Sequence, residues 1–126
     1  MKAFSRSWKS SVRPAKQRKY VAKAPLHTRH KLMAAHLTKE LRLKYKKRSF
    51  PVRRGDKVKI MAGKFRGVIG EIERVDAKKY RVFVKGAEIQ KKEGAPKIFR
   101  GVHPSKLQII TLNLDDKKRA KALERK

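Results

Sequence analysis

The chain contains no cysteine, and only 10 of its 126 residues are Asp or Glu. The lack of cysteine excludes disulfides, cysteine-ligated zinc and thiol catalysis. The scarcity of carboxylates leaves 38 Lys and Arg residues largely unbalanced, at a formal net charge of +28. Because like charges repel one another in a compact state, a chain of this kind needs a dense anionic partner.

Long hydrophobic runs are also missing. No stretch approaches the ~18 apolar residues of a membrane span, and no cationic segment has a full apolar face, so a membrane surface is a weak candidate for the anion. The first residues lead into further charge rather than into a signal core, so secretion is not expected. Their Arg- and Ser-rich composition faintly resembles an organellar transit peptide, but the basic residues continue past position 50. Nucleic acid, with its regularly spaced phosphates, is the favoured partner.

The charge divides the chain. Residues 1–54 contain 18 Lys and Arg but a single acid, Glu40. Within them, residues 1–24 lack an apolar period and predict a basic extended arm that orders on a partner. Residues 25–54 predict a short helical extension of two helices with a break near His36. Pro25 suits the first turn of one helix, which would place Met33 and Leu37 near one face, and Thr38 is a candidate N-cap of the other.

From residue 55 the apolar period changes to two. Val58 and Ile60 alternate with lysines, and similar alternation covers Tyr80 to Val84 and Ile109 to Thr111. Turn-forming residues separate these runs, which predicts four or five short antiparallel strands over residues 55–112. The expected fold is therefore mainly β, a small barrel of the SH3-like type.

Residues 113–126 predict a C-terminal basic helix. Asp115 and Asp116 precede six Lys and Arg residues, and this order complements the dipole of a helix. Leu123 is the only large apolar residue toward its end, so we expect this helix to be peripheral.

A glycine-rich stretch joins the first two predicted strands between Gly55 and Val75. The glycines expected to be structural are Gly55, Gly63, Gly67 and Gly70. Glycine at these points permits positive φ, a tight turn and close approach of two backbones. Lys64 and Arg66 would then stand at the tip of the loop. The stretch resembles the KOW motif of ribosomal proteins and of transcription elongation factors of the NusG and Spt5 type; the alternative is an ordinary glycine-rich hairpin.

The resemblance extends on both sides of the KOW stretch. The matching segments are Ala24–Met33, Leu37–Arg42, Arg48–Arg53, Val102–Leu107 and Leu112–Asp115. Together they are similar to the archaeal and eukaryotic form of the universal large-subunit ribosomal protein twenty-four family, over about residues 15 to 125. Residues 1–14 and the loop Lys91–Lys97 depart from the family pattern. The short charged tail favours the archaeal form.

That resemblance implies an SH3-like barrel bound to the first domain of large-subunit ribosomal RNA, near the exit of the peptide tunnel. It also implies neighbouring ribosomal proteins as partners, a role early in subunit assembly, and a location on cytoplasmic ribosomes.

Cations, histidines and two aromatic residues are expected to contact RNA, because phosphates attract the charges and unpaired bases stack on aromatic faces. The candidates are Arg6, Trp8, Lys9, Arg13, Lys16, Arg18, Lys19, Lys23, His27, Arg29, His30, Lys31, Arg48, Arg53, Arg54, Lys64, Phe65, Arg66, Lys91, Lys92, Lys97, Arg100 and His103. For Trp8 stacking on RNA is favoured. For Phe65 stacking and hydrophobic anchoring are equally supported, and for Phe50 anchoring is favoured.

No catalytic, cofactor or metal site is expected. His27 and His30 are spaced i, i+3, but no cysteine or nearby carboxylate completes a ligand set. Gly63–Gly67 lacks the Gly-Lys-Ser/Thr ending of a nucleotide-binding loop. Asp56, Glu71, Glu73 and Asp76 lie among cations and are interpreted as solvated salt-bridge partners. Nothing assembles a nucleophile, a base and an oxyanion site.

Three functional classes therefore stay open. Most of the matching segments support the first class, a structural RNA-binding protein of the large ribosomal subunit. A KOW-type transcription elongation module would be expected to carry a separate preceding domain. A non-specific nucleic-acid chaperone of histone-like character would bind with weak selectivity.

Overall fold

The computed structural model describes residues 4–5 and 11–125. Its helices are α1 (Pro14–Lys23), α2 (Leu26–Leu32), α3 (Lys39–Tyr45), the 3₁₀ turn η1 (Pro104–Lys106) and α4 (Lys117–Glu124). Its strands are β1 (Ala34–Leu37), β2 (Ser49–Pro51), β3 (Lys57–Ile60), β4 (Ile69–Asp76), β5 (Arg81–Val84), β6 (Glu88–Ile89), β7 (Ile98–Phe99) and β8 (Leu107–Thr111).

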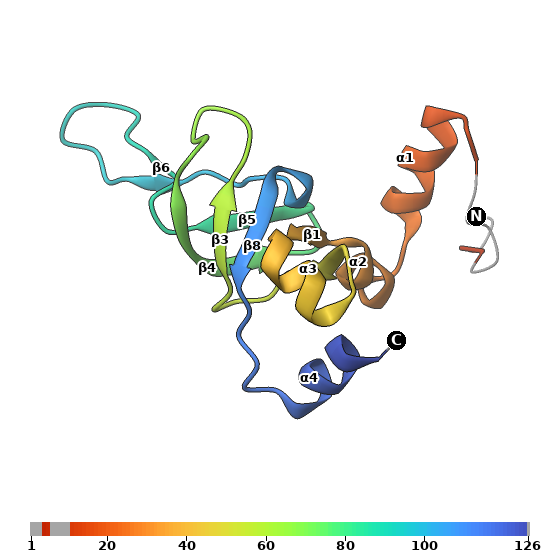
Figure 1. Cartoon of the computed structure of the whole chain (residues 1–126). Coiled ribbons are helices and arrows are strands. Elements are labelled where there is room, and N and C mark those ends of the chain that lie inside the picture. Colours follow the sequence, from red (N-terminus) through yellow and green to blue (C-terminus); the bar gives the residue numbers. More distant parts are fainter. Residues whose placement is uncertain (1–3, 6–10, 126) are drawn as a thin grey trace.

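Six strands form one sheet in the order β2-β1-β8-β3-β4-β5, and β6 pairs with β7 alone. The pairings are antiparallel except for β1 with β8, which run parallel. The prediction of a mainly β domain is confirmed. Among the described residues, however, the pairings leave β2 and β5 at the two ends of the order and do not close a barrel. In Figure 1 the β6–β7 hairpin and its loop project from one end of the molecule, and α1 lies at the other.

The core consists of the residues that alternate on the strands. Val58, Ile60, Val82, Val84 and Ile109 are each at most 1% exposed. Burying one face of each strand accounts for the period of two in the sequence. The alternation therefore located this core correctly.

The predicted start of one strand was wrong. Tyr80 was expected in a strand, but its φ of 57° places it in the left-handed region, in the turn before β5. Thr111 does lie in β8, as expected, and is exposed at its end. A turn from Asp76 to Tyr80 joins β4 to β5, and the carboxylate of Asp76 accepts a hydrogen bond from the Lys79 N–H at 3.0 Å.

The N-terminal half differs from the expected arrangement in two places. The extended arm is wrong for Pro14–Lys23, which forms α1: Pro14 opens the helix and good helix formers follow. The two short helices exist as α2 and α3, but residues 34–37 between them form β1. Leu37, expected on a helix, is fully buried in β1, because pairing with Ile109 of β8 gives it a place in the core.

The C-terminal helix exists as expected but is not peripheral. Leu123 is 1% exposed and Arg119 is 8% exposed. Asp116 caps α4, its carboxylate accepting a hydrogen bond from the Lys118 N–H at 2.8 Å. Two residues that face the sheet therefore hold α4 against it.

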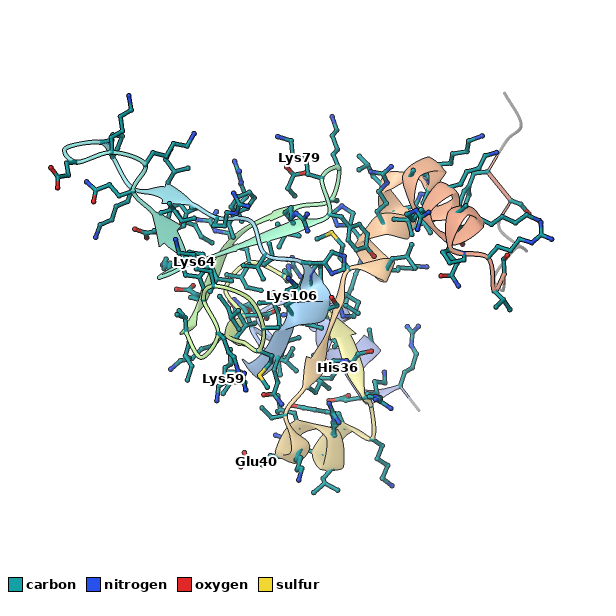
Figure 2. The ribbon with its side chains drawn as sticks, turned by 90° about the horizontal axis from the view of Figure 1, so that it is seen from above. His36, Glu40, Lys59, Lys64, Lys79 and Lys106 are labelled. Carbon is teal, nitrogen blue, oxygen red and sulfur yellow. The ribbon has the colours of Figure 1, made fainter. Side chains whose placement is uncertain are left out.

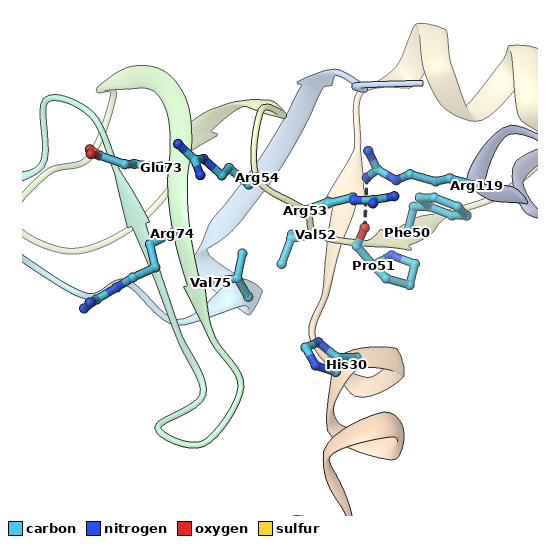
Figure 3. A pocket seen from close by; sticks show the side chains of 10 residues that line it. All are labelled: His30, Phe50, Pro51, Val52, Arg53, Arg54, Glu73, Arg74, Val75 and Arg119. Atoms are coloured by element: carbon cyan, nitrogen blue, oxygen red, sulfur yellow. Dashed lines mark hydrogen bonds between the residues drawn. The ribbon is translucent and has the colours of Figure 1, made fainter. Parts of the chain in front are cut away.

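Asp56 is the second correction in this region, because it is fully buried rather than solvated. Its two carboxylate oxygens lie 2.6 and 2.7 Å from the guanidinium nitrogens of Arg119. They also accept the backbone N–H groups of Arg53 and Asn113 at 2.8 and 2.9 Å. Arg119 donates further to the Pro51 carbonyl at 3.1 Å, as the dashed line in Figure 3 shows. We call this bidentate pair the Asp56–Arg119 clamp.

The glycines of the KOW stretch divide into two kinds. Gly55 in the turn before β3, and Gly63 and Gly67 in the β3–β4 loop, adopt positive φ values of 88°, 97° and 91°, which glycine permits without strain. Gly70 does not. A Cβ atom at Gly70 would lie 2.1 Å from the carbonyl oxygen of Lys85, so glycine there permits the close approach of β4 to the end of β5.

Candidate nucleic-acid interface

Helix α1 carries its cations on an exposed surface. It has no buried residue, and the candidates Arg13, Lys16, Arg18, Lys19 and Lys23, on it or at its N-cap, are all exposed. Their charges are available to a partner. The candidates Arg6, Trp8 and Lys9 lie outside the described residues.

Helix α2 contributes three exposed candidates, His27, His30 and Lys31. Arg29 on the same helix is half-buried and donates to the carbonyl oxygens of Ala24 at 2.9 Å, Lys78 at 2.8 Å and Ala22. These bonds tie the α1–α2 connection to the turn between β4 and β5. Arg29 therefore has a structural role that the sequence did not indicate.

The loop between β3 and β4 presents Lys64 and Arg66 to solvent, as its glycines predicted. A hydrogen bond from the Arg66 N–H to the Gly63 carbonyl, at 3.1 Å, closes the turn. Phe65 between them is half-buried and packs against the core. This packing confirms the anchoring that the sequence left open for Phe65, and stacking on RNA stays a prediction.

A pocket of about 420 Å³ brings together candidates that are far apart in the sequence. Lys64 and Phe65 come from the β3–β4 loop, and Arg100 and His103 come from the segment between β7 and η1. Lys64 and Lys106 are labelled near one another in Figure 2, and both line this pocket. Lys106 was not predicted. Neither was Arg81, which also lines the pocket and lies at the start of β5.

His103 lines the same pocket as those two unpredicted cations. Partial burial, and then the charges of Arg81 and Lys106, lower the pKa of His103 below its ordinary value of 6.5. Its Nδ1 atom accepts a hydrogen bond from the Ser105 N–H at 3.2 Å, which assigns the ring proton of the neutral form to Nε2. The ring lies against Tyr80, with centroids 5.3 Å apart. At neutral pH this histidine is a flat, uncharged side chain.

A second pocket, of about 580 Å³, lies beside β2. It combines the candidates His30, Arg53 and Arg54 with Glu73 and Arg74 (Figure 3). Unlike the first pocket, it contains a carboxylate.

Arg53 at this pocket is also engaged within the chain. It pairs with Asp116 at 2.7 Å, and this hydrogen bond lowers the pKa of the Asp116 carboxyl. The side chain of Arg48, just ahead of β2, is exposed. This face is therefore of mixed charge.

The loop between β6 and β7 carries the exposed candidates Lys91, Lys92 and Lys97. It projects away from the sheet in Figure 1. In the part of the chain that the structure describes, no three His, Asp or Glu side chains gather closely enough to hold a metal ion. Over those same residues, no helix is long and apolar enough to cross a membrane.

Fold and surface together define a class, that of small and strongly basic mainly β proteins whose loops and exposed helix present cations. Comparison with known proteins identifies the family within this class. Residues 11–126 match the family that comprises the eukaryotic ribosomal protein L26 and its archaeal counterpart, ribosomal protein twenty-four. The chain belongs to this family, whose members are structural proteins and not enzymes.

Two relatives illustrate the match. The large ribosomal subunit protein uL24 of Methanosphaera stadtmanae is 49% identical over 116 residues, covering 92% of this chain and 98% of the relative. The protein of the same name from Korarchaeum cryptofilum is 47% identical over 116 residues, covering 92% of this chain and 88% of the relative. Both organisms are archaea, in agreement with the archaeal form that the sequence favours.

Proposed function

We propose that the chain is a structural constituent of the large ribosomal subunit, on cytoplasmic ribosomes, where it binds the large-subunit ribosomal RNA. The observation that carries the proposal is the pocket lined by Lys64, Arg81, Arg100 and Lys106, to which three separate segments of the chain contribute cations. Convergent cations supply phosphate affinity, and the shape of the fold then sets the register on RNA. The names of the relatives support the choice of the large subunit.

The finer proposal concerns the place of binding. We infer that the contact is with the first domain of the large-subunit RNA, near the exit of the peptide tunnel, and that it forms early in assembly beside neighbouring ribosomal proteins. In this arrangement the strands of residues 55–112, to which β1 and β2 of residues 25–54 add, act as the anchor on the RNA. Residues 1–24 and the C-terminal helix of residues 113–126 lie around it.

Sedimentation tests the coarser proposal. Tagged chain expressed in an archaeal host is expected to travel stoichiometrically with the large subunit through a sucrose gradient at high salt. Travel with RNA polymerase instead would support the elongation-factor alternative. If the chain instead spreads over all RNA-containing fractions and dissociates from them at high salt, the result would support the nucleic-acid chaperone.

A footprint tests the finer proposal. Hydroxyl-radical cleavage of large-subunit RNA, with and without the chain, is expected to show protection confined to the first domain. Omission of the chain from reconstitution is expected to stop assembly at an early particle. Protection of another RNA domain would refute the proposed place of binding. A complete particle that lacks only this chain would refute the proposed early role in assembly.

A further inference from the structure

Two pockets adjoin on the face that carries His103. The first is the 420 Å³ pocket beside the β3–β4 loop, and the second, of about 620 Å³, lies between α1 and the β4–β5 turn. Arg81 and His103 line both of them. The two pockets therefore adjoin at these two side chains, and we call them together the His103 groove.

The charged residues that line the His103 groove are all cations. Lys64, Arg81, Arg100 and Lys106 line the first pocket. Arg18, Arg29, Lys78 and Lys79 line the second, together with the shared Arg81.

Among the described residues that line the groove there is no Asp or Glu. The pocket beside β2 differs, since Glu73 lies in its wall. A polyanion that passes through the His103 groove meets cations along its whole length and no repelling carboxylate.

Aromatic rings stand along the same path. Phe65 lines the first pocket, Tyr80 lines the second, and His103 lies at their junction. All three side chains are half-buried, so each leaves part of its ring accessible. In a duplex the bases are stacked on one another and cannot use such rings, whereas unpaired bases can. Each pocket also has the size of a small-molecule site.

One cation of the groove packs closely against the backbone. The stem of Arg81 crosses Gly101 so closely that a Cβ atom there would lie 2.9 Å from the Cβ atom of Arg81. Gly101 thus leaves room for the side chain of Arg81, and less ordering of this cation remains to be done on binding.

We propose that the His103 groove binds a single-stranded segment of RNA, with its phosphates along Arg81 and Lys106 and an unstacked base against Phe65 and another against Tyr80. The inference rests on the proposed function and specifies the form of RNA that this face accepts.

Binding of two probes by the full chain tests the inference. The first is a non-self-complementary RNA of about 12 nucleotides, a length that single-strand binders cover, and the second is the same strand annealed to its complement. A 2-aminopurine base in the single strand reports stacking through quenching of its fluorescence. We expect the single strand to bind more tightly than the duplex and its fluorescence to be quenched.

Matched variants separate the groove from general charge. Arg81→Ala/Lys106→Ala removes two groove cations, and Lys118→Ala/Lys121→Ala removes two exposed cations from α4. The groove variant is expected to lose at least about tenfold more single-strand affinity than the α4 variant. Phe65→Leu keeps an apolar side chain in the core and removes the aromatic face, so a roughly 5- to 100-fold loss and weaker quenching are expected. Phe65→Tyr should restore both.

Three results would overturn the inference: equal or tighter duplex binding, equal losses for the two double variants, or unchanged quenching in Phe65→Leu. Each would leave the proposed function standing if the wild-type chain still travels with the large subunit. Absence of the wild-type chain from that subunit would refute the proposed function itself, whatever the oligonucleotides show.

Discussion

Removal of the Asp56 carboxylate is expected to destabilise the free protein more than removal of any exposed carboxylate. In Asp56→Ala the guanidinium of Arg119 keeps its bonds to the carbonyls of Asn113 and Pro51 but loses its counter-charge while 8% exposed. The backbone N–H groups of Arg53 and Asn113 lose their acceptor at the same time.

The magnitude follows from the burial. Removing one partner of a buried ion pair costs about 3–5 kcal/mol, out of a total stability of roughly 5–15 kcal/mol for a domain. At this chain length each 1 kcal/mol corresponds to roughly 3–5 °C in melting temperature, so we expect Asp56→Ala to melt about 10–25 °C lower. Glu71→Ala is the matched control, because Glu71 pairs with Lys85 at 3.0 Å on the surface and both side chains are at least half exposed. Its cost should be at most about 1 kcal/mol.

Thermal unfolding followed by circular dichroism, without RNA and at moderate salt, measures both variants. The double variant Asp56→Ala/Arg119→Met should recover part of the loss, because it leaves no unpaired buried charge. If Asp56→Ala melts within a few degrees of Glu71→Ala, the clamp does not hold α4 to the sheet and the reasoning fails.

Three further predictions concern the loop, the sheet and the histidine. Lys64→Ala/Arg66→Ala should leave the melting temperature within about 2 °C of wild type and flatten the salt dependence of RNA binding by roughly 1.5 units of slope; an unchanged slope would show that neither side chain meets phosphate. Gly70→Ala should lower the melting temperature sharply, because its Cβ atom would meet the Lys85 carbonyl oxygen, and a melting temperature equal to wild type would contradict that close approach. Because the pKa of His103 is lower in the folded chain than its ordinary 6.5, the unfolded chain binds more protons around that pH. Stability should thus be full above about pH 7 and fall as the pH drops through 6.5, and His103→Gln should abolish this part of the pH dependence in thermal melts.

The strands could be predicted because their signal is local. Val58, Ile60, Val82 and Val84 alternate with polar residues, and the same faces are buried in the structure. Each residue reports its own side of the strand, so no knowledge of the partner strand is needed. The start of β5 was predicted too early, at Tyr80, because the alternation of apolar and polar residues does not indicate that this tyrosine adopts a left-handed conformation.

Burial of charge could not be predicted in the same way. Asp56 looks like one more solvated acid in the sequence, since its partner Arg119 lies 63 positions further along the chain. The same holds for β1, which the sequence presented as part of a helical segment. Its parallel pairing with β8 buries Leu37, and no local feature of residues 34–37 predicts that pairing.

By itself, then, the sequence determined the mainly β class, the glycine turn with Lys64 and Arg66, and the expectation of a polyanionic partner. Composition, the apolar period and turn-forming residues can be read from the sequence without knowledge of distant contacts. Tertiary structure alone decided the strand order, the Asp56–Arg119 clamp and the His103 groove. These depend on contacts between segments far apart in the chain, such as Phe65 with the pocket that Arg81 and Lys106 complete. Such contacts form only when the whole sheet and its helices pack together, because each must offset the entropy of ordering distant residues.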